Sequence, residues 1–322
     1  MPSSRATMIG ASALLLWSTL AILTSWTGQV PPFQLVAMAF AMGSLIALVN
    51  WTVKGQAILP RLKQPLGAWV LGVAGLFGYH FFYFLALRLA PPLEANLLNY
   101  LWPLLIVLFS ALLPGEHLHF RHIAGALAGM GGAVLLITKS GGASFDPRYL
   151  LGYGAAVACG VIWAGYSVLN RRYKQVPSDA VGGFCAATAL LALVCHLAFE
   201  QTVWPEGWQW LAVLALGTGP VGVAFFVWDH GCKHGNIRAL GAMAYAVPLL
   251  SNGLLIVFGR GDLTLRVAGA AALIIGGAIL GTGDLISWRR PALKSPHPEE
   301  ARYGRLEGPP VIELPASLGS SG

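Results

Sequence analysis

Polar and aromatic side chains interrupt several long apolar stretches of the sequence. In one stretch Tyr79 and Tyr83 are four residues apart, on one face of a helix, and His80 lies beside them. In the next stretch Asn99 precedes Trp102 by three residues. Phenol, imidazole and amide groups bind a small solute by hydrogen bonds, and flat rings hold an apolar part by stacking. These residue types therefore indicate a binding site for a small amphipathic molecule.

Further aromatic residues occur deep in other apolar stretches. They are Trp17, Trp163, Tyr166, Phe225 and Tyr245. Such residues are costly against lipid and usually face a partner helix or a water-filled cavity. We therefore predict that all of these residues line one cavity. Ordinary packing is the alternative for each tryptophan, and His80 either carries a proton or simply packs.

Fixed charges are scarce in these stretches. Glu94, Asp229 and Asp284 fall near the ends of their stretches, and no acidic residue is expected to be well buried. A cavity with aromatic walls and few charges suits a net-neutral solute better than a phosphate or a nucleotide sugar. A transporter of cationic drugs is expected to contain a buried acid, so the pattern favours neutral zwitterions.

The composition predicts a membrane protein. Of the 322 residues, 56% are hydrophobic and 10% are charged, and the mean hydropathy is +0.66. Soluble domains contain about 25% charged residues. The net charge of +7 arises from short clusters between apolar stretches, so a nucleic-acid partner is not expected.

The apolar stretches have the length of bilayer crossings, and each must be a helix because lipid cannot satisfy backbone amides. Ten are predicted, at residues 7–27, 33–53, 66–87, 93–113, 121–138, 149–170, 180–199, 208–229, 237–258 and 265–287.

The basic residues set the predicted orientation. With the N-terminus inside, the outer segments hold only Arg88, Lys139, Arg148, Arg260 and Arg266 out of 20 Lys and Arg residues. The inner segments then hold the remainder, including Lys233. Cytoplasmic loops carry an excess of basic residues, which places both termini in the cytoplasm.

A sequence repeat divides the chain. Tyr-x-x-Pro-Leu-Leu occurs at Tyr100 and again at Tyr245, an offset of 145 residues that also carries Pro103 onto Pro248. Five helices per copy is an odd number, so the second copy enters the membrane inverted. Inverted repeats are typical of secondary transporters that work by alternating access. Pro103 and Pro248 are the predicted points of helix bending.

The ten spans, the inverted duplication and the proline in the fourth helix of each half resemble the drug/metabolite transporter superfamily, EamA type. The resemblance covers about residues 6–288 and implies two EamA-like repeats, 1–140 and 147–288. It implies export of small solutes from the cytoplasm across the bacterial inner membrane. Residues 289–322 are predicted to form a disordered cytoplasmic tail, whose last residues are typical of a vector-derived extension.

We predict an exporter of aromatic or other hydrophobic neutral amino acids, without a cofactor and as a monomer. Nucleobases, dipeptides and cationic compounds remain alternative substrates, and proton exchange and facilitated export both remain open. Neither catalytic motifs nor a ring of pore-lining groups favours an enzyme or a channel. No metal is expected, although His117, His119 and His122 lie close together in the sequence.

Overall fold

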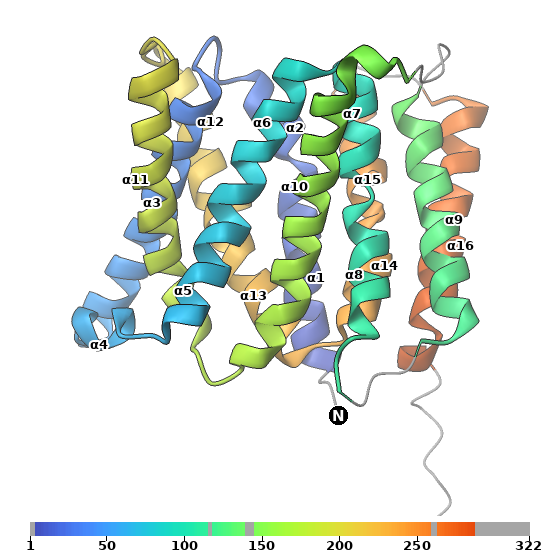
Figure 1. Ribbon diagram of the computed structural model, residues 1–322, viewed down its shortest axis with the longest axis horizontal. Coiled ribbons are helices and arrows are strands. Elements are labelled where there is room, and N and C mark those ends of the chain that lie inside the picture. Colours follow the sequence, from blue (N-terminus) through green and yellow to red (C-terminus); the bar gives the residue numbers. More distant parts are fainter. Residues whose placement is uncertain (1–3, 115–117, 139–144, 259–262, 287–322) are drawn as a thin grey trace, which may run out of the picture. The chain divides into compact units, whose positions relative to one another are not determined.

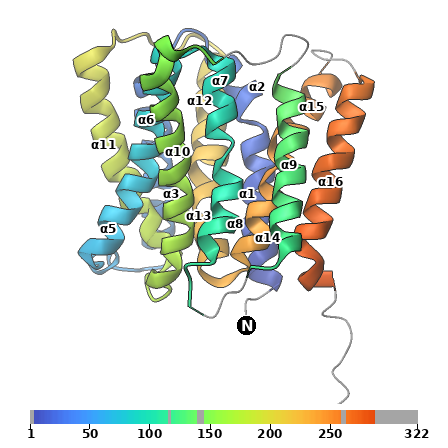
Figure 2. The ribbon, with the colours of Figure 1, turned by 45° about the vertical axis from the view of Figure 1, so that its right-hand side comes forward.

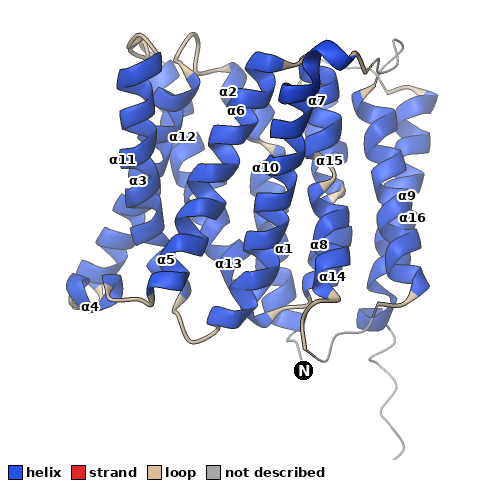
Figure 3. Cartoon of the chain, in the orientation of Figure 1, coloured by secondary structure: helices blue, strands red, loops and turns tan. Residues whose placement is uncertain are grey.

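The structure is a computed structural model, which describes residues 4–114, 118–138, 145–258 and 263–286. Every regular element in these residues is a helix, as Figure 3 shows, which confirms the predicted all-α class. The predictions for the tail 289–322, His117, Lys139 and Arg260 lie outside these residues.

The first half contains helices of very different lengths. Its elements are α1 Ser4–Ser18, α2 Leu20–Ser25, α3 Pro32–Val53, α4 Ile58–Leu62, α5 Leu66–Val73, the π-helical segment η1 Ala74–Gly78, α6 Tyr79–Leu89, α7 Pro92–Asn99, α8 Trp102–Ser110 and α9 Phe120–Ile137.

The second half repeats this series. Its elements are the 3-10 turn η2 Pro147–Tyr149, α10 Leu150–Leu169, the 3-10 turns η3 Asn170–Tyr173 and η4 Ser178–Ala180, α11 Val181–Phe199, α12 Gln209–Thr218, the π-helical segment η5 Gly219–Val223, α13 Ala224–His234, α14 Ile237–Ala244, α15 Ala246–Val257 and α16 Leu265–Ile286.

Eight helical stretches in the described residues are long and apolar enough to cross a membrane, and Leu265–Gly281 is a shorter apolar helix. Two predicted spans are divided at matched places: 93–113 after Asn99 into α7 and α8, and 237–258 after Ala244 into α14 and α15. Another, predicted to end at residue 229, continues to His234. In the first case a proline interrupts each helix that was predicted to be continuous. In the second case charged side chains led to a predicted helix end, although the helix continues through them.

The repeat is visible in the helix boundaries. An offset of 145 residues carries η1 onto η5, α6 onto α13 and α7 onto α14, residue for residue. Figures 1 and 2 show α6 and α13 running in opposite directions along the bundle. The duplicated sequence therefore forms the same local structure twice, with the second copy inverted.

The two prolines explain why α7 and α14 are short. In a continuous helix, residues 103 and 248 would donate hydrogen bonds to the carbonyls of Asn99 and Ala244. Proline has no N–H, and those two residues are where α7 and α14 end. The chain resumes as α8 and α15, with Pro103 and Pro248 in their first turns.

Small residues allow the helices to approach closely. A Cβ at Gly10 in α1 would lie 2.7 Å from the Cα of Gly231 in α13. In the same way, a Cβ at Gly125 in α9 would lie 2.5 Å from the carbonyl oxygen of Gly277 in α16. Close backbone approach is how membrane helices gain packing energy, so these contacts hold the bundle around its centre.

Candidate functional site

Five aromatic rings from both halves meet at the centre of the bundle. This aromatic cluster consists of Trp17 of α1, Trp102 of α8, Trp163 of α10, and Phe225 and Trp228 of α13. Trp17 lies in the middle, with ring centroids 5.0 Å from Trp228, 5.5 Å from Trp163, 5.9 Å from Phe225 and 6.4 Å from Trp102. The structure therefore brings Trp17, Trp102, Trp163 and Phe225 together, and their lining of a substrate cavity stays a prediction.

Hydrogen bonds fix the orientation of two of these rings. The indole N–H of Trp17 donates to the carbonyl of Pro220, in η5, at 3.0 Å. The indole N–H of Trp228 donates to Ser167 Oγ at 3.1 Å. A buried indole N–H needs an acceptor. The first bond ties the first helix of one half to the third span of the other, and the second bond ties α13 to α10 within the second half.

A polar edge borders the cluster on the α6 side. The ring of Tyr79 lies 5.4 Å from that of Trp163. Its hydroxyl accepts a hydrogen bond from Asn99 Nδ2 at 3.1 Å, and the thiol of Cys159 donates to Asn99 Oδ1 at 3.2 Å. Since Asn99 supplies the hydrogen, the O–H of Tyr79 is left to donate to a ligand.

Tyr83 and His80 complete this edge. The Tyr83 hydroxyl donates to Asn96 Oδ1 at 2.9 Å. His80 Nδ1 lies 2.7 Å from the carbonyl oxygen of Leu76. A carbonyl can only accept, so Nδ1 carries the hydrogen and the neutral ring keeps Nε2 as an acceptor. His80 also contacts Phe225, with centroids 6.4 Å apart, which joins the polar edge to the aromatic cluster.

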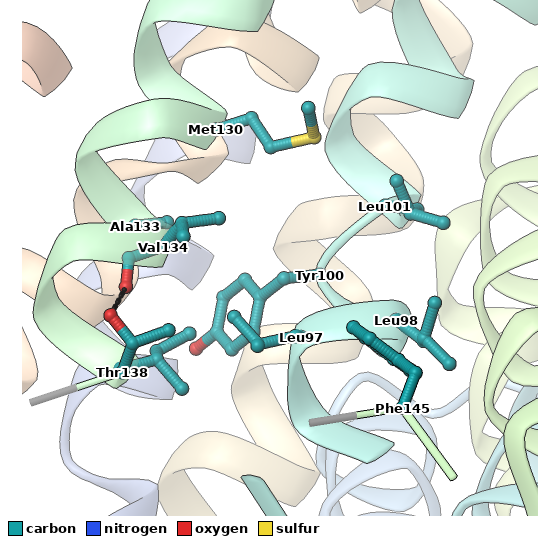
Figure 4. Close-up of a pocket in the computed structure, with 10 residues that line it drawn as sticks. Leu97, Leu98, Tyr100, Leu101, Met130, Ala133, Val134, Thr138 and Phe145 are labelled. Carbon is teal, nitrogen blue, oxygen red and sulfur yellow. Dashed lines mark hydrogen bonds between the residues drawn. The ribbon is translucent and has the colours of Figure 1, made fainter. Parts of the chain in front are cut away.

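The aromatic cluster is closed in this structure, because each of its rings is less than a tenth exposed. A pocket of about 390 Å³ lies elsewhere, between α9 on one side and α7 with the link that follows it on the other (Figure 4). Its walls are nearly all apolar, and its polar groups are those of Tyr100 and Thr138. It therefore lacks the groups needed to bind a zwitterion, and we place the candidate site at the aromatic cluster and its polar edge.

One predicted site residue lies behind the aromatic cluster, and another lies apart from it. Tyr166 is beside Trp163, with ring centroids 5.3 Å apart and the rings tilted by 37°, but its ring is packed against Gly75 and is 2% exposed. Tyr245 is fully buried in a separate apolar cluster with Val107 and Ile274. Their positions in the sequence suggested helix faces that line the cavity, but in the structure neighbouring helices cover both side chains.

The expectation that no acid is well buried is wrong. Asp229 is completely buried, and Glu94 is 6% exposed. Asp229 Oδ2 lies 2.8 Å from Lys233 Nζ, and Lys233 is 1% exposed rather than part of an inner loop. The Asp-to-Lys spacing of four residues, which places the two side chains on one helical face, was the signal that the sequence interpretation missed.

The described residues contain no group of three or more potential metal ligands. His122 belongs to α9 rather than to the preceding loop, where its side chain accepts from the backbone N–H of His119 at the start of that helix. These two histidines therefore act as a helix cap in this structure.

The chain belongs to the EamA-like transporter family, whose pattern matches residues 5–138 and again residues 150–282. It is therefore a transporter and not an enzyme, and the two matches correspond to the two halves described above. Its membership also accounts for the multi-pass arrangement of apolar helices.

Individual relatives are similar over nearly their whole length. The aromatic amino acid exporter YddG of Ancylobacter novellus is 55% identical over 283 residues, which cover 88% of this chain and 98% of that protein. The aromatic amino acid exporter YddG of Escherichia coli is 25% identical, over 87% of this chain and 97% of that protein. A crystal structure of a protein 53% identical in sequence superposes with a TM-score of 0.85, and the match covers 89% of this chain and 99% of that protein's chain.

Proposed function

We propose that this protein exports aromatic and other hydrophobic neutral amino acids from the cytoplasm. The observation that carries the proposal is the aromatic cluster, contributed by both halves and bordered by Tyr79, His80 and Asn99. The relatives named above as aromatic amino acid exporters support the same substrate class.

The polar edge matches the two charged groups of an amino acid. The His80 Nε2 lone pair accepts a hydrogen bond from the substrate ammonium, and the Tyr79 O–H donates to the substrate carboxylate. The substrate ring then lies against Trp163 and Trp17. Each ring contact contributes about 0.5–1.5 kcal/mol beyond burial, which suits reversible binding and release.

The buried Asp229 does not turn this site into a cation receptor. Lys233 neutralises it at 2.8 Å, and Asn170 Nδ2 donates to its other oxygen at 2.6 Å. A cationic substrate would have to displace a lysine that is itself buried. Neutral zwitterions therefore remain the favoured class.

We infer ten membrane-spanning helices with both termini in the cytoplasm of a bacterial cell, in the inner membrane. The eight helical stretches of sufficient length, the pair α14–α15 and α16 together support this number. The excess of Lys and Arg on one side supports the orientation. The two repeats, 1–140 and 147–288, form a monomer that needs no cofactor.

Alternating access follows from movement of matched parts of the two halves. The breaks before Pro103 and Pro248 and the π-helical segments η1 and η5 occur at equivalent positions. π-helical turns are frequently found at functional sites, and missing hydrogen bonds make a helix easier to bend. We therefore assign bending to these four places.

The first test is uptake of radiolabelled phenylalanine, tryptophan and threonine into proteoliposomes, with and without a pH gradient. Saturable uptake of the aromatic amino acids, blocked by an excess of unlabelled tryptophan, is the expected result. Stimulation by the gradient would add proton exchange, and its absence would assign facilitated export. Uptake of nucleobases, dipeptides or cationic dyes without any amino acid would contradict the proposed substrate.

A further inference from the structure

The C-terminal part of α13 carries a buried polar group that substrate binding does not use. Asp229 and Lys233 form an ion pair of 2.8 Å. Asn170 Nδ2, at the end of α10, donates to Asp229 Oδ1 at 2.6 Å, and Lys233 Nζ donates to the carbonyl of Val176 at 3.0 Å. We call Asp229, Lys233, Asn170 and the Val176 carbonyl the α13 lock.

The α13 lock lies at one end of the bundle, where α1 and α13 are in contact. The backbone N–H of Asn236, just after α13, donates to Thr7 Oγ1 near the start of α1 at 2.8 Å. A Cβ on Gly231 would lie 2.5 Å from the Cα of Gly10, so α1 and α13 touch there. The lock is thus at the end of the bundle where α1 begins (Figure 1).

The lock also adjoins the aromatic cluster. Trp228 immediately precedes Asp229, and its indole donates to Ser167, three residues before Asn170. The α10–α13 contact therefore passes from the cluster directly into the lock. These contacts hold α10 and α13 together between the cluster and this end of the bundle.

The repeat offers a direct comparison at the opposite end. The offset of 145 residues places Phe84 at the position of Asp229 and Arg88 at that of Lys233. Arg88 is exposed, and Phe84 packs against Phe33 and His80. Because phenylalanine cannot ionise, this end of the bundle has no equivalent ion pair at these positions.

The arrangement of the charges makes the lock reversible. Removing two charges from water is unfavourable, and attraction between them offsets that penalty only in part. Both charges belong to α13. Its separation from the end of α10 and from the turn after η3 therefore breaks the bonds to Asn170 and Val176 but keeps the ion pair. Water then solvates the pair, which opposes the loss of the two hydrogen bonds.

A hydroxyl close to the α13 lock supports a second position of α13. Tyr166, on α10, has a fully buried hydroxyl that makes no hydrogen bond within the described part of the chain. It lies close enough to Asp229 for the two to interact electrostatically. A buried hydroxyl without a partner is unfavourable. If α13 moved, the Tyr166 hydroxyl could donate a hydrogen bond to it.

We propose that the α13 lock is the gate at this end of the transport path, which is the cytoplasmic end in the proposed topology. The inference rests on the proposed transport function for its role but not on the identity of the substrate. In the closed gate, Asn170 and the Val176 carbonyl hold the ion pair away from water. The gate opens when α13 moves away from α10 and the pair becomes hydrated.

Cys232 is a natural reporter of this movement. It is completely buried on α13, between Asp229 and Lys233, so a maleimide reaches it only when the gate opens. The experiment uses the full chain with Cys159→Ser, Cys185→Ala and Cys195→Ala as the background. The rate of Cys232 labelling is measured in membrane vesicles without substrate and compared within this background.

Asn170→Ala removes the bond between α10 and the ion pair while leaving the pair intact. We expect Cys232 labelling to become roughly tenfold faster, as for the loss of one hydrogen bond to a charged group. Arg88→Ala changes the repeat-equivalent position at the other end, and it should leave the labelling rate unchanged. Equal labelling in Asn170→Ala and the background would overturn the gate.

A second variant, Asp229→Asn with Lys233→Met, removes both charges. It removes the gain in hydration on opening, so we expect slower Cys232 labelling and slower transport with an unchanged or higher unfolding temperature. Faster labelling with a lower unfolding temperature would show that the pair only stabilises the fold, and would overturn the proposal. Labelling that responds as expected without any amino acid uptake would leave the gate in place and contradict only the proposed substrate.

Discussion

Helices α6 and α13 occupy equivalent places in the two halves but carry different chemistry. α6 presents Tyr79, His80 and Tyr83, which form the polar edge with the amides of α7. α13 presents Phe225 and Trp228, followed by the buried charges. The scaffold is symmetric, whereas its side chains are not.

For the proposed zwitterionic substrate, this difference provides two distinct surroundings. By the repeat offset His80 corresponds to Phe225, and these two residues meet at the centre with centroids 6.4 Å apart. Hydrogen-bonding groups are concentrated on the α6 side and indole rings on the side of α1, α10 and α13. The two equivalent helices thus carry the two proposed roles separately, with binding on α6 and gating on α13.

The largest expected effect comes from Lys233→Ala, which removes the buried cation that distinguishes α13 from α6. It leaves Asp229 buried without its cation, and we expect a loss of about 3–5 kcal/mol in the free energy of unfolding. Thermal unfolding followed by size-exclusion chromatography in detergent measures it. The matched variant Arg88→Ala removes an exposed charge and should change stability by less than about 0.5 kcal/mol; equal losses in both would contradict the burial argument.

Trp163→Ala tests the aromatic side of the comparison. This ring contacts Trp17, Trp102, Phe225 and Tyr79, so we expect the apparent affinity for tryptophan to fall roughly tenfold. Competition uptake in proteoliposomes measures the change. Trp204→Ala is the control, because Trp204 is 66% exposed and lies outside the cluster. Unaltered affinity in folded Trp163→Ala protein would remove this ring from the site.

His80 tests the polar edge. His80→Leu removes the Nε2 acceptor, and we expect the Michaelis constant for phenylalanine to rise about fivefold. His80→Gln places an amide oxygen near the position of Nε2 and should recover part of this loss. If leucine and glutamine behave alike, shape rather than hydrogen bonding explains the role of His80.

The smallest effect is expected from Tyr245→Phe, since Tyr245 lies in the separate cluster with Val107 and Ile274. Uptake should change by less than about twofold, within the range of peripheral substitutions. Tyr79→Phe, which removes the O–H assigned to the substrate carboxylate, should raise the Michaelis constant several-fold in the same assay. The reverse order would return Tyr245 to the substrate site.

Much of the helical arrangement could be predicted from local features. Apolar length located the spans, and the repeated Tyr-x-x-Pro-Leu-Leu located both halves and both helix breaks. The structure brings Trp17, Trp102, Trp163 and Phe225 together, in keeping with the rule that aromatic residues deep in apolar spans usually face other helices. By contrast, Tyr245 was grouped with them because it occupies the repeat position of Tyr100. Equivalent positions in two repeats do not need to have equivalent neighbours in the fold.

The sequence by itself determined the membrane class, the spans, the duplication and the set of rings available at the centre. These properties depend on apolar length, composition and spacing, which are local. Only the tertiary structure decided that the rings close on one another, that Tyr245 packs elsewhere, and that Asp229 and Lys233 are buried. Burial of a charge depends on partners from distant segments, here Asn170 and the carbonyl of Val176, and no local pattern places those partners beside α13.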